Sequence, residues 1–319
     1  ERGEELFALA RKHGVPIGFE ASVAAAIPII KSLRETFVAN RITGILAILN
    51  GTTNYILTRM DEDGVSFEQA LRRAQALGYA EADPSLDISG KDAAHKIAIL
   101  ARYAFHTVVP VREIFIEGIE RVDRMDCTFA REFCYAVKLL AVARRKGGLL
   151  DVRVHPALLS TRHLLAGVRD VYNAVYLEGD LIGSSLLFGE GAGGPAAASS
   201  VLSDIVDVCL RRDAAAGDGV LSSAARGPGL MSAGDVVSRF YFRFSAVDRP
   251  GVLARISAVL GRFGISIASV TQKETRSNGP VPIVMLTHRA SFRQVSQALR
   301  LINRLSVICH PTVSIPIQE

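Results

Sequence analysis

Four carboxylates and one lysine follow one another closely in the sequence, and their types suit proton transfer. They run from a loop bounded by Gly78 and Pro84 into a helical pattern, and they are Glu81, Asp83, Asp87, Asp92 and Lys96. Asp92 and Lys96 are four positions apart, so on a helix they lie on one face and point into one pocket. Such a set suits a site that holds a charged substrate and moves a proton. The alternative is a solvated acidic turn followed by an ordinary surface ion pair.

Capping residues, glycines and apolar periodicity predict the elements that position these residues. A helix should begin at Ser66 and end at Gly78, and the next helix should span 92–103. Upstream, alternating β-branched residues predict a strand over 42–49 that ends at Asn50-Gly51. Thr52 or Thr53 can then cap a helix over 54–60.

The rest of the chain alternates between predicted strands and helices and contains one linker. We expect helices ending at Gly14 and spanning about 25–35 and 199–211, with strands at 15–19, 111–117, 136–144, 149–154, 171–178 and 180–188. Residues 213–237 are rich in Gly, Ala and Ser, which is typical of a linker. Beyond it, strands at 240–244, 266–271, 281–287 and 307–315 with helices at 251–263 and 292–303 give the βαββαβ order of a ferredoxin-like sandwich. The predicted fold class is therefore α/β combined with α+β.

The composition excludes several classes of protein. With 319 residues and 49% hydrophobic content, the chain can bury more than one core. Its longest apolar runs are too short to span a bilayer or are broken by proline, which argues against a membrane protein. The net charge of +5 comes from scattered arginines without interleaved aromatics, which argues against nucleic-acid binding. Cysteines without metal-ligand spacing indicate a reducing, cytoplasmic compartment, and they are Cys127, Cys134, Cys209 and Cys309.

Four segments carry a resemblance to a known enzyme family. They are Gly18-Phe19-Glu20-Ala21-Ser22-Val23, Asn50-Gly51-Thr52-Thr53-Asn54-Tyr55, Gly78-Tyr79-Ala80-Glu81-Ala82-Asp83-Pro84 and Gly189-Glu190-Gly191-Ala192-Gly193-Gly194. In this order they resemble homoserine dehydrogenase, and the resemblance covers nearly the whole chain. The βαββαβ unit, with Asp248-Arg249-Pro250-Gly251 at its first turn, resembles an ACT domain.

The resemblance implies an NAD- or NADP-dependent interconversion of L-aspartate 4-semialdehyde and L-homoserine, in threonine and methionine biosynthesis. Lys96 matches the family's proton donor, and Asp92 lies beside it to orient the lysine or the substrate hydroxyl. A lysine serves this role only if burial brings its pKa down toward neutrality. Positions matching those that hold the substrate or line its pocket are Glu81, Asp87, Gly51, Thr52 and Tyr79.

The resemblance also implies a monovalent-cation site for Na⁺ or K⁺, built mainly from backbone carbonyls. Its ligands would be Glu20, Val23, Ala25 and Ile27, since alkali ions prefer oxygen. The run Ala24-Ala25-Ala26 stands where glycines usually follow, so these ligands require backbone angles that alanine allows. The alternative is that Glu20 caps the next helix.

Gly191 is the residue expected to contact the cofactor. It lies in Gly189-x-Gly191-x-x-Gly194, which fits the dinucleotide fingerprint but is weak evidence outside a βαβ unit. The resemblance implies that this loop presses its backbone near the nicotinamide. Pro195-Ala196-Ala197 replaces the usual apolar-Pro-Thr and so removes a helix cap.

The resemblance also predicts how the chain is divided. Residues 1–20 match the end of a nucleotide-binding domain whose glycine loop would lie upstream, so impaired cofactor binding is expected. Residues 21–212 match the catalytic and dimerisation domain, of which 188–212 return to the nucleotide-binding domain, 213–237 form the linker and 238–319 the ACT domain. A homodimer or homotetramer with an amino-acid effector at the ACT domain is implied. The alternatives are an empty dimerisation module, an amino-acid sensor or an inactive paralogue.

Overall fold

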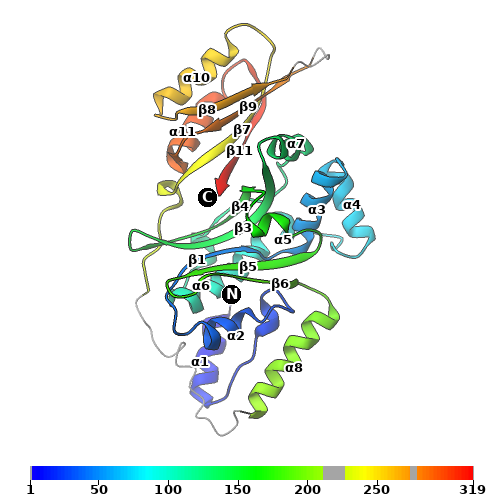
Figure 1. The fold of residues 1–319 in the computed structure, drawn as a ribbon, viewed down its shortest axis with the longest axis vertical. Helices are drawn as coiled ribbons and strands as arrows, with labels where there is room; N and C mark the ends of the chain where they lie inside the picture. The colour runs from blue at the N-terminus through cyan, green and yellow to red at the C-terminus, as the bar shows by residue number, and fades with distance from the viewer. Residues whose placement is uncertain (1, 211–226, 274–278, 319) are drawn as a thin grey trace.

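Within the described residues, one mixed sheet of eleven strands joins an N-terminal half, with strands between 42 and 190, to a C-terminal half, with strands between 237 and 318 (Figure 1). The computed structural model describes residues 2–210, 227–273 and 279–318. Nine strands follow one another across the sheet in the order β6 (Gly183–Glu190), β5 (Tyr172–Gly179), β1 (Ile42–Ile48), β3 (Tyr135–Lys146), β4 (Leu149–Ser160), β11 (Ile308–Gln318), β7 (Val237–Ala246), β9 (Val281–Thr287) and β8 (Ile267–Gln272). The short strands β2 (Phe115–Ile116) and β10 (Ala290–Ser291) pair with β4 and β7.

Helices cover one face of the first half of the sheet. They are α3 (Gly51–Glu62), α6 (Lys91–Phe105) and α7 (Arg124–Glu132), while α4 (Phe67–Ala76) packs on α3, and α5 (Ser85–Ile88) packs on α3 and α6. Along α6 the residues Ala93, Ile97, Leu100 and Ala104 are buried, which is the stripe of a helix packed on a sheet. The opposite sheet face forms a second cluster, in which Leu140 and the other inner residues are covered by the turn Leu164–Gly167.

The second half has the predicted βαββαβ order. Helices α10 (Val252–Arg262) and α11 (Phe292–Ile302) cover one face of its strands, and Phe240, Phe242 and Phe244 alternate along β7 into the core between them. The mixed α/β class and the C-terminal ferredoxin-like unit are therefore confirmed.

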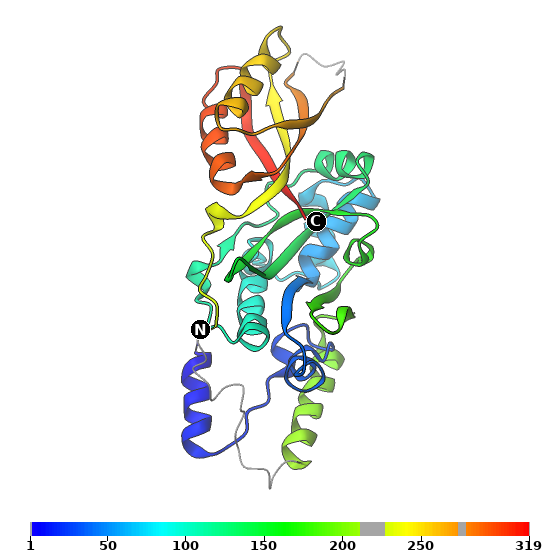
Figure 2. The ribbon, with the colours of Figure 1, turned by 60° about the vertical axis from the view of Figure 1, so that its left-hand side comes forward.

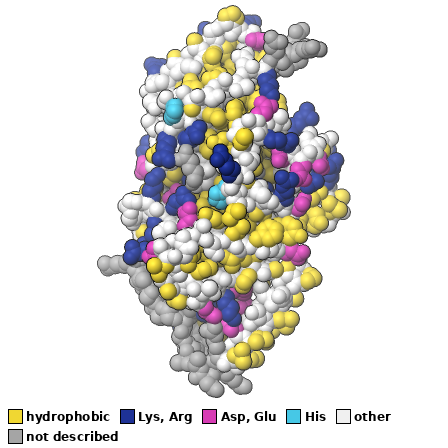
Figure 3. Space-filling model, viewed as in Figure 1, with side chains coloured by type: hydrophobic (Ala, Val, Ile, Leu, Met, Phe, Trp, Pro, Cys, Tyr) yellow, Lys and Arg dark blue, Asp and Glu magenta, His cyan; other side chains and the backbone are white. Residues whose placement is uncertain are grey.

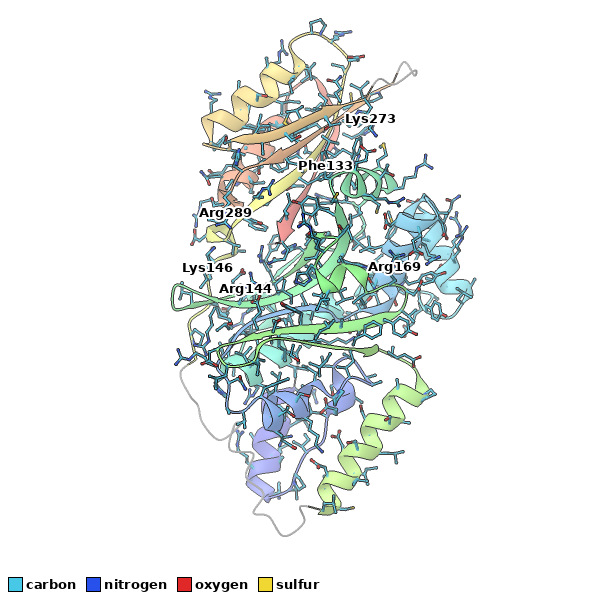
Figure 4. All side chains as sticks on the ribbon, viewed as in Figure 1. Phe133, Arg144, Lys146, Arg169, Lys273 and Arg289 are labelled. Carbon is cyan, nitrogen blue, oxygen red and sulfur yellow. The ribbon has the colours of Figure 1, made fainter. Side chains whose placement is uncertain are left out.

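The two halves are joined by strand pairing and by buried polar contacts. Ile317 of β11 pairs with Leu158 of β4 in parallel register. Asp126 of α7 is fully buried and accepts hydrogen bonds from Tyr241 and Arg243 of β7. In Figure 4, Lys273 reaches toward α7 near Phe133, and its amine pairs with Glu132. Figure 2 shows the two halves as lobes that meet along the long axis of the molecule.

A third region lies at the far end of the molecule from the ferredoxin-like unit (Figure 1). It contains α1 (Gly3–His13) and α8 (Gly194–Leu210). Apolar side chains on α8 point outward, with Leu202 61% and Ile205 53% exposed. None of the helices in the described part of the chain combines the length and apolar character that a bilayer crossing requires.

Three of the predicted helices and strands are absent or shorter than expected. Residues 15–19 form no ladder within the described residues and run as irregular chain. The expected helix over 25–35 is reduced to α2 (Ile29–Lys31) and a π-helical turn (Ser32–Thr36), since Pro28 precedes α2 and Ala24 is left-handed. The strand expected at 111–117 shortens to β2 because a 3₁₀ turn follows Pro110. Of the predicted linker, residues 213–226 lie outside the described residues.

Candidate functional site

Asn50 joins the segments that carry the predicted acidic residues. It has extended backbone angles at the N-cap of α3, where its Oδ1 accepts a hydrogen bond from the Thr53 amide at 2.9 Å. Its Nδ2 donates to Asp87 Oδ1 at 2.7 Å and to Asp92 Oδ2 at 2.9 Å. The helix cap is therefore Asn50, not Thr52 or Thr53 as the sequence suggested. Asparagine is a preferred N-cap, which was the signal available in the sequence.

Lys96 and Asp92 form a partly buried ion pair on α6. The amine of Lys96 lies 2.7 Å from Asp92 Oδ2 and donates to the Leu49 carbonyl at 2.9 Å. The two side chains are 19% and 21% exposed, so this is not the surface pair of the alternative interpretation. The start of α6 is fixed by Gly90, whose φ of 80° is favoured only by glycine and whose Cα faces Val154 and Ile116. The result is an amine, two carboxylates and an amide gathered at the ends of β1, α5 and α6.

Gly51, Thr52 and Tyr79 lie at the same end of α3. A Cβ on Gly51 would stand 2.6 Å from the Val171 carbonyl oxygen, so only glycine allows this backbone approach. Thr52 donates through Oγ1 to the Tyr79 carbonyl at 2.6 Å, which ties the loop after α4 to α3. Tyr79 is 44% exposed, and its ring centroid lies 5.2 Å from that of Tyr55. This position is compatible with the predicted role of Tyr79 as a wall of the substrate pocket.

Glu81 stands apart from the other predicted substrate residues. Its side chain is exposed, and its carbonyl oxygen accepts a hydrogen bond from Gln75 at 3.2 Å. Asp87 has direct contact with Asn50, so its proposed role has the stronger geometric support of the two.

A second lysine, which the sequence did not predict as part of the site, lies beside α3. Lys138 of β3 is 4% exposed, and its amine donates to Asn54 Oδ1 at 3.0 Å and to the Val168 carbonyl. Burial and, to a smaller extent, the positive charge of nearby Arg169 lower the pKa of Lys138 to about 8. Asn54 Nδ2 in turn donates to the carbonyls of residues 168, 170 and 172. The available signal was a charged residue inside the apolar run 136–143.

The proposed cation segment is already engaged by protein groups. The Glu20 carboxylate accepts hydrogen bonds from the amides of Ile30 at 2.7 Å and Lys31 at 2.8 Å, which is the helix-capping alternative. Burial raises the pKa of Glu20, and these two hydrogen bonds oppose the rise. The Ala25 carbonyl accepts from Ser200, and Ala24 has a φ of 55°, a conformation unfavourable for alanine. Val23 is buried and would offer only its backbone carbonyl, and the Ile27 carbonyl already accepts a hydrogen bond from the Ile29 amide at 2.7 Å. These residues therefore fit a cation poorly.

Gly191 lies against a buried amide. A Cβ there would stand 2.0 Å from Asn173 Cγ, so the loop 189–194 requires glycine at this position. Asn173 is 1% exposed, and neither its Oδ1 nor its Nδ2 has a hydrogen-bond partner. An unpaired buried amide is costly unless a polar group completes it. Gly191 is buried as well, so a nicotinamide cofactor can reach the Asn173 amide only when the loop 189–194 moves away from it. Within the described residues, no cluster of three metal-ligating side chains is found.

The chain is similar to known proteins along its whole length. The family model described as homoserine dehydrogenase matches residues 28–206, and the ACT domain model matches 240–307. The homoserine dehydrogenase of Pseudomonas aeruginosa is 41% identical, over 99% of this chain and 74% of that protein. The crystal structure of a homoserine dehydrogenase from Thiobacillus denitrificans has a TM-score of 0.92 at 40% identity, over 100% of this chain and 74% of that chain. A hyperthermophilic archaeal homoserine dehydrogenase in complex with NADPH has a TM-score of 0.57 at 33% identity, over 66% and 61%.

Proposed function

Because the chain belongs to the homoserine dehydrogenase family, we propose that it interconverts L-aspartate 4-semialdehyde and L-homoserine with NAD or NADP, as a step in threonine and methionine biosynthesis. The observation that carries this proposal is the network of Asn50, Asp87, Asp92 and Lys96. The network brings one amine and two carboxylates together, and the side chains of Lys96 and Asp92 remain partly exposed. A charged substrate can therefore approach the proton donor.

When bound, a nicotinamide cofactor supplies the hydride that reduces the carbonyl carbon. Lys96 then donates a proton from its amine to the carbonyl oxygen, so hydride and proton together convert the aldehyde to an alcohol. Asp92 orients the Lys96 amine, and Asn50 holds Asp92 in place. Asp87 binds the substrate ammonium, because a carboxylate is its natural partner. Gly51 and Thr52 line the end of the pocket that receives the substrate carboxylate.

For the cofactor, we propose that Gly191 and Asn173 bind the nicotinamide end. Support comes from the unpaired side-chain amide of Asn173, which lies against Gly191, and from the archaeal relative named as an NADPH complex. We expect the residues of this chain taken alone to bind the dinucleotide weakly. The loop 189–194 follows β6, which pairs antiparallel with β5, and is not the first turn of a βαβ unit. The outward apolar face of α8 fits the predicted return of 188–212 to a nucleotide-binding domain.

We further propose that copies of the chain associate and that an amino acid regulates them. Figure 3 shows apolar side chains gathered on one face near the β5–β6 hairpin and α8, where Phe188 and Tyr172 are among the exposed ones. Light scattering should give a dimer or tetramer, and a monomer at all concentrations would contradict this part. All four cysteines are free, which supports a reducing, cytoplasmic compartment.

The reaction is tested by following homoserine-dependent reduction of NAD and of NADP. We expect Asp87→Asn to raise the KM for homoserine about tenfold or more, since a charge-assisted contact is lost. Asp83→Asn is the matched control, because Asp83 is exposed in the loop just before α5 and, within the described residues, its side chain hydrogen-bonds to Ser85 alone. The alternative, an amino-acid sensor or inactive paralogue, predicts amino-acid binding without turnover. Equal KM values in the two variants would remove Asp87 from the substrate site.

A further inference from the structure

The side-chain amide of Asn50 has hydrogen-bond partners on both of its polar atoms. Its Nδ2 donates to Asp87 Oδ1 at 2.7 Å and to Asp92 Oδ2 at 2.9 Å. Its Oδ1 accepts hydrogen bonds from the backbone amide and from the hydroxyl of Thr53, both at 2.9 Å. Asn50 is buried, so its amide is held in one orientation and little water competes for these hydrogen bonds.

One amide nitrogen therefore holds two carboxylates close together. The charge of Asp92 is compensated by the Lys96 amine at 2.7 Å, whereas Asp87 has no ion pair among the described residues. Like charges at this separation repel each other, and a neutral amide between them offsets the repulsion only in part. The group therefore lacks one cation. The substrate ammonium, which the proposed function assigns to Asp87, would supply it.

The same contacts form a continuous path from the ammonium-binding carboxylate to the proton donor. It consists of three hydrogen bonds of 2.7, 2.9 and 2.7 Å, which join Asp87, Asn50, Asp92 and Lys96 in that order. Hydrogen bonds in such a chain polarise one another, so a change of charge at one end alters the bonds along it.

A substrate ammonium on Asp87 changes this chain in a definite direction. The carboxylate of Asp87 then attracts the Asn50 amide less strongly, so that amide is donated more strongly to Asp92. Asp92 in turn holds the Lys96 amine less tightly. An N–H of Lys96 becomes available to the substrate oxygen at the moment when the correct substrate is bound.

We propose that Asn50 is a positioning residue that makes proton transfer from Lys96 depend on recognition of the substrate ammonium by Asp87. This inference rests on the proposed function and deepens it, because it names the substrate group that the site senses. An alcohol or aldehyde without the ammonium leaves Asp87 uncompensated, so it loses kcat as well as affinity. The site therefore selects α-amino acids at the chemical step in addition to the binding step.

A purely structural role for Asn50, as the cap of α3, gives a different expectation. Serine and aspartate are also good N-caps, so Asn50→Ser and Asn50→Asp keep α3 capped. The serine side chain is shorter and has a single hydrogen to donate, and an ionised aspartate has none. Neither residue can donate to Asp87 and Asp92 together. Both variants therefore preserve the cap and remove the bridge between the carboxylates.

The coupling is tested by a double-mutant cycle on homoserine oxidation with the full-length protein. In the wild-type background, Asp87→Asn should lower kcat at least about tenfold besides raising KM, since the charge at the start of the chain is removed. Asn50→Ser alone should also lower kcat about tenfold. In the Asn50→Ser background, Asp87→Asn should still raise KM but change kcat by less than about threefold, and the Asn50→Asp background should behave in the same way.

Thr53→Val is the matched control for the cap. It removes the hydroxyl that bonds to Asn50 and leaves the two contacts of Asn50 with the carboxylates. It should lower the melting temperature and keep the full loss of kcat on Asp87→Asn. Losses of kcat in Asn50→Ser and Asp87→Asn that multiply in the double variant, or an unchanged kcat in Asn50→Ser, would overturn the coupling. Absence of homoserine oxidation by the wild type would instead overturn the proposed function on which it rests.

Discussion

Two lysines flank the first turns of α3 and differ in every respect that matters for chemistry. Lys96 is partly exposed and faces the carboxylate of Asp92, whereas Lys138 is almost fully buried and faces the neutral oxygens of Asn54 and Val168. A buried amine without a carboxylate loses hydration and gains little in return, so its pKa falls to about 8. Burial alone therefore does not select the proton donor, and we propose Lys96 for this role on two other properties. Its side chain is partly open to solvent, and the Asp92 carboxylate orients its amine.

The largest effect should follow from removing the amine at the accessible site. Lys96→Met should lower kcat by about 10²–10⁴-fold, the usual contribution of a general acid. The melting temperature should change by only a few degrees, because the pair is partly solvated. Lys91→Met is the control, since Lys91 is exposed on the first turn of the same helix. Activity within threefold of wild type would remove Lys96 from the chemistry.

The buried lysine should affect stability and its dependence on pH. The pKa of Lys138 is about 8 in the folded protein and 10.5, the ordinary value, in the unfolded chain. Between these two pH values the unfolded chain therefore binds more protons than the folded chain. The free energy of unfolding of wild type relative to Lys138→Met should therefore rise by about 3 kcal/mol across this window, at about 1.4 kcal/mol per unit. Urea unfolding at several pH values measures it.

The control for that series is Lys146→Met, at the exposed end of the same strand (Figure 4). It should track wild type at every pH. Turnover of Lys138→Met should stay within a few-fold of wild type, since in the described part of the chain the Lys138 amine contacts Asn54 and Val168 rather than Asp87 or Asp92. A loss of turnover as large as that of Lys96→Met would erase the distinction between the two lysines.

A smaller effect should follow from changing the partner of Lys96. Asp92→Asn keeps the shape but replaces a charge-assisted hydrogen bond with a neutral one, so kcat/KM should fall about 10–100-fold. In the double variant with Lys96→Met the loss should be no larger than in Lys96→Met alone, because the two groups act together. Additive losses would mean that Asp92 acts independently of the lysine.

The smallest effect concerns Arg169, labelled in Figure 4. Its charge is the second cause of the lowered pKa of Lys138, after burial. Arg169→Gln should therefore raise the pKa of Lys138 in the folded protein, so the pH at which the stability begins to rise should move upward. This change should be smaller than the lowering of the pKa that burial causes. An unchanged transition would leave burial as the whole cause.

Local patterns in the sequence predicted the helices and strands better than they predicted the contacts between them. The four-residue spacing placed Asp92 and Lys96 on one face of α6, and Ser66 and Gly78 delimited α4 correctly. The role of Asn50 could not be read in this way, because its partners Asp87 and Asp92 lie 37 and 42 positions away. Such contacts depend on how elements pack.

The sequence did not predict the role of Lys138 or the presence of helix α7, because both depend on contacts between residues far apart in the chain. Lys138 lies in a run that is apolar enough to predict a buried strand, and only the tertiary position of Asn54 shows how its amine is accommodated. The capping box of Asp123 and Asp126 begins α7, yet Asp126 also accepts hydrogen bonds from distant Tyr241 and Arg243. The contacts of Glu20 likewise favoured the helix-capping alternative over the cation site, although both had been anticipated.

The pairing of β11 with β4 has a consequence for biosynthesis. Ribosomes release β4 long before β11, so the part of β4 that later receives Ile317 and Gln318 is an unprotected strand edge while the rest is translated. Linker residues 229 and 231 hydrogen-bond to Leu150 near the other end of β4 and can shield only that end. A nascent chain stalled in the ferredoxin-like unit would thus expose a ready template for aggregation, and chaperone dependence should be greatest at that stage.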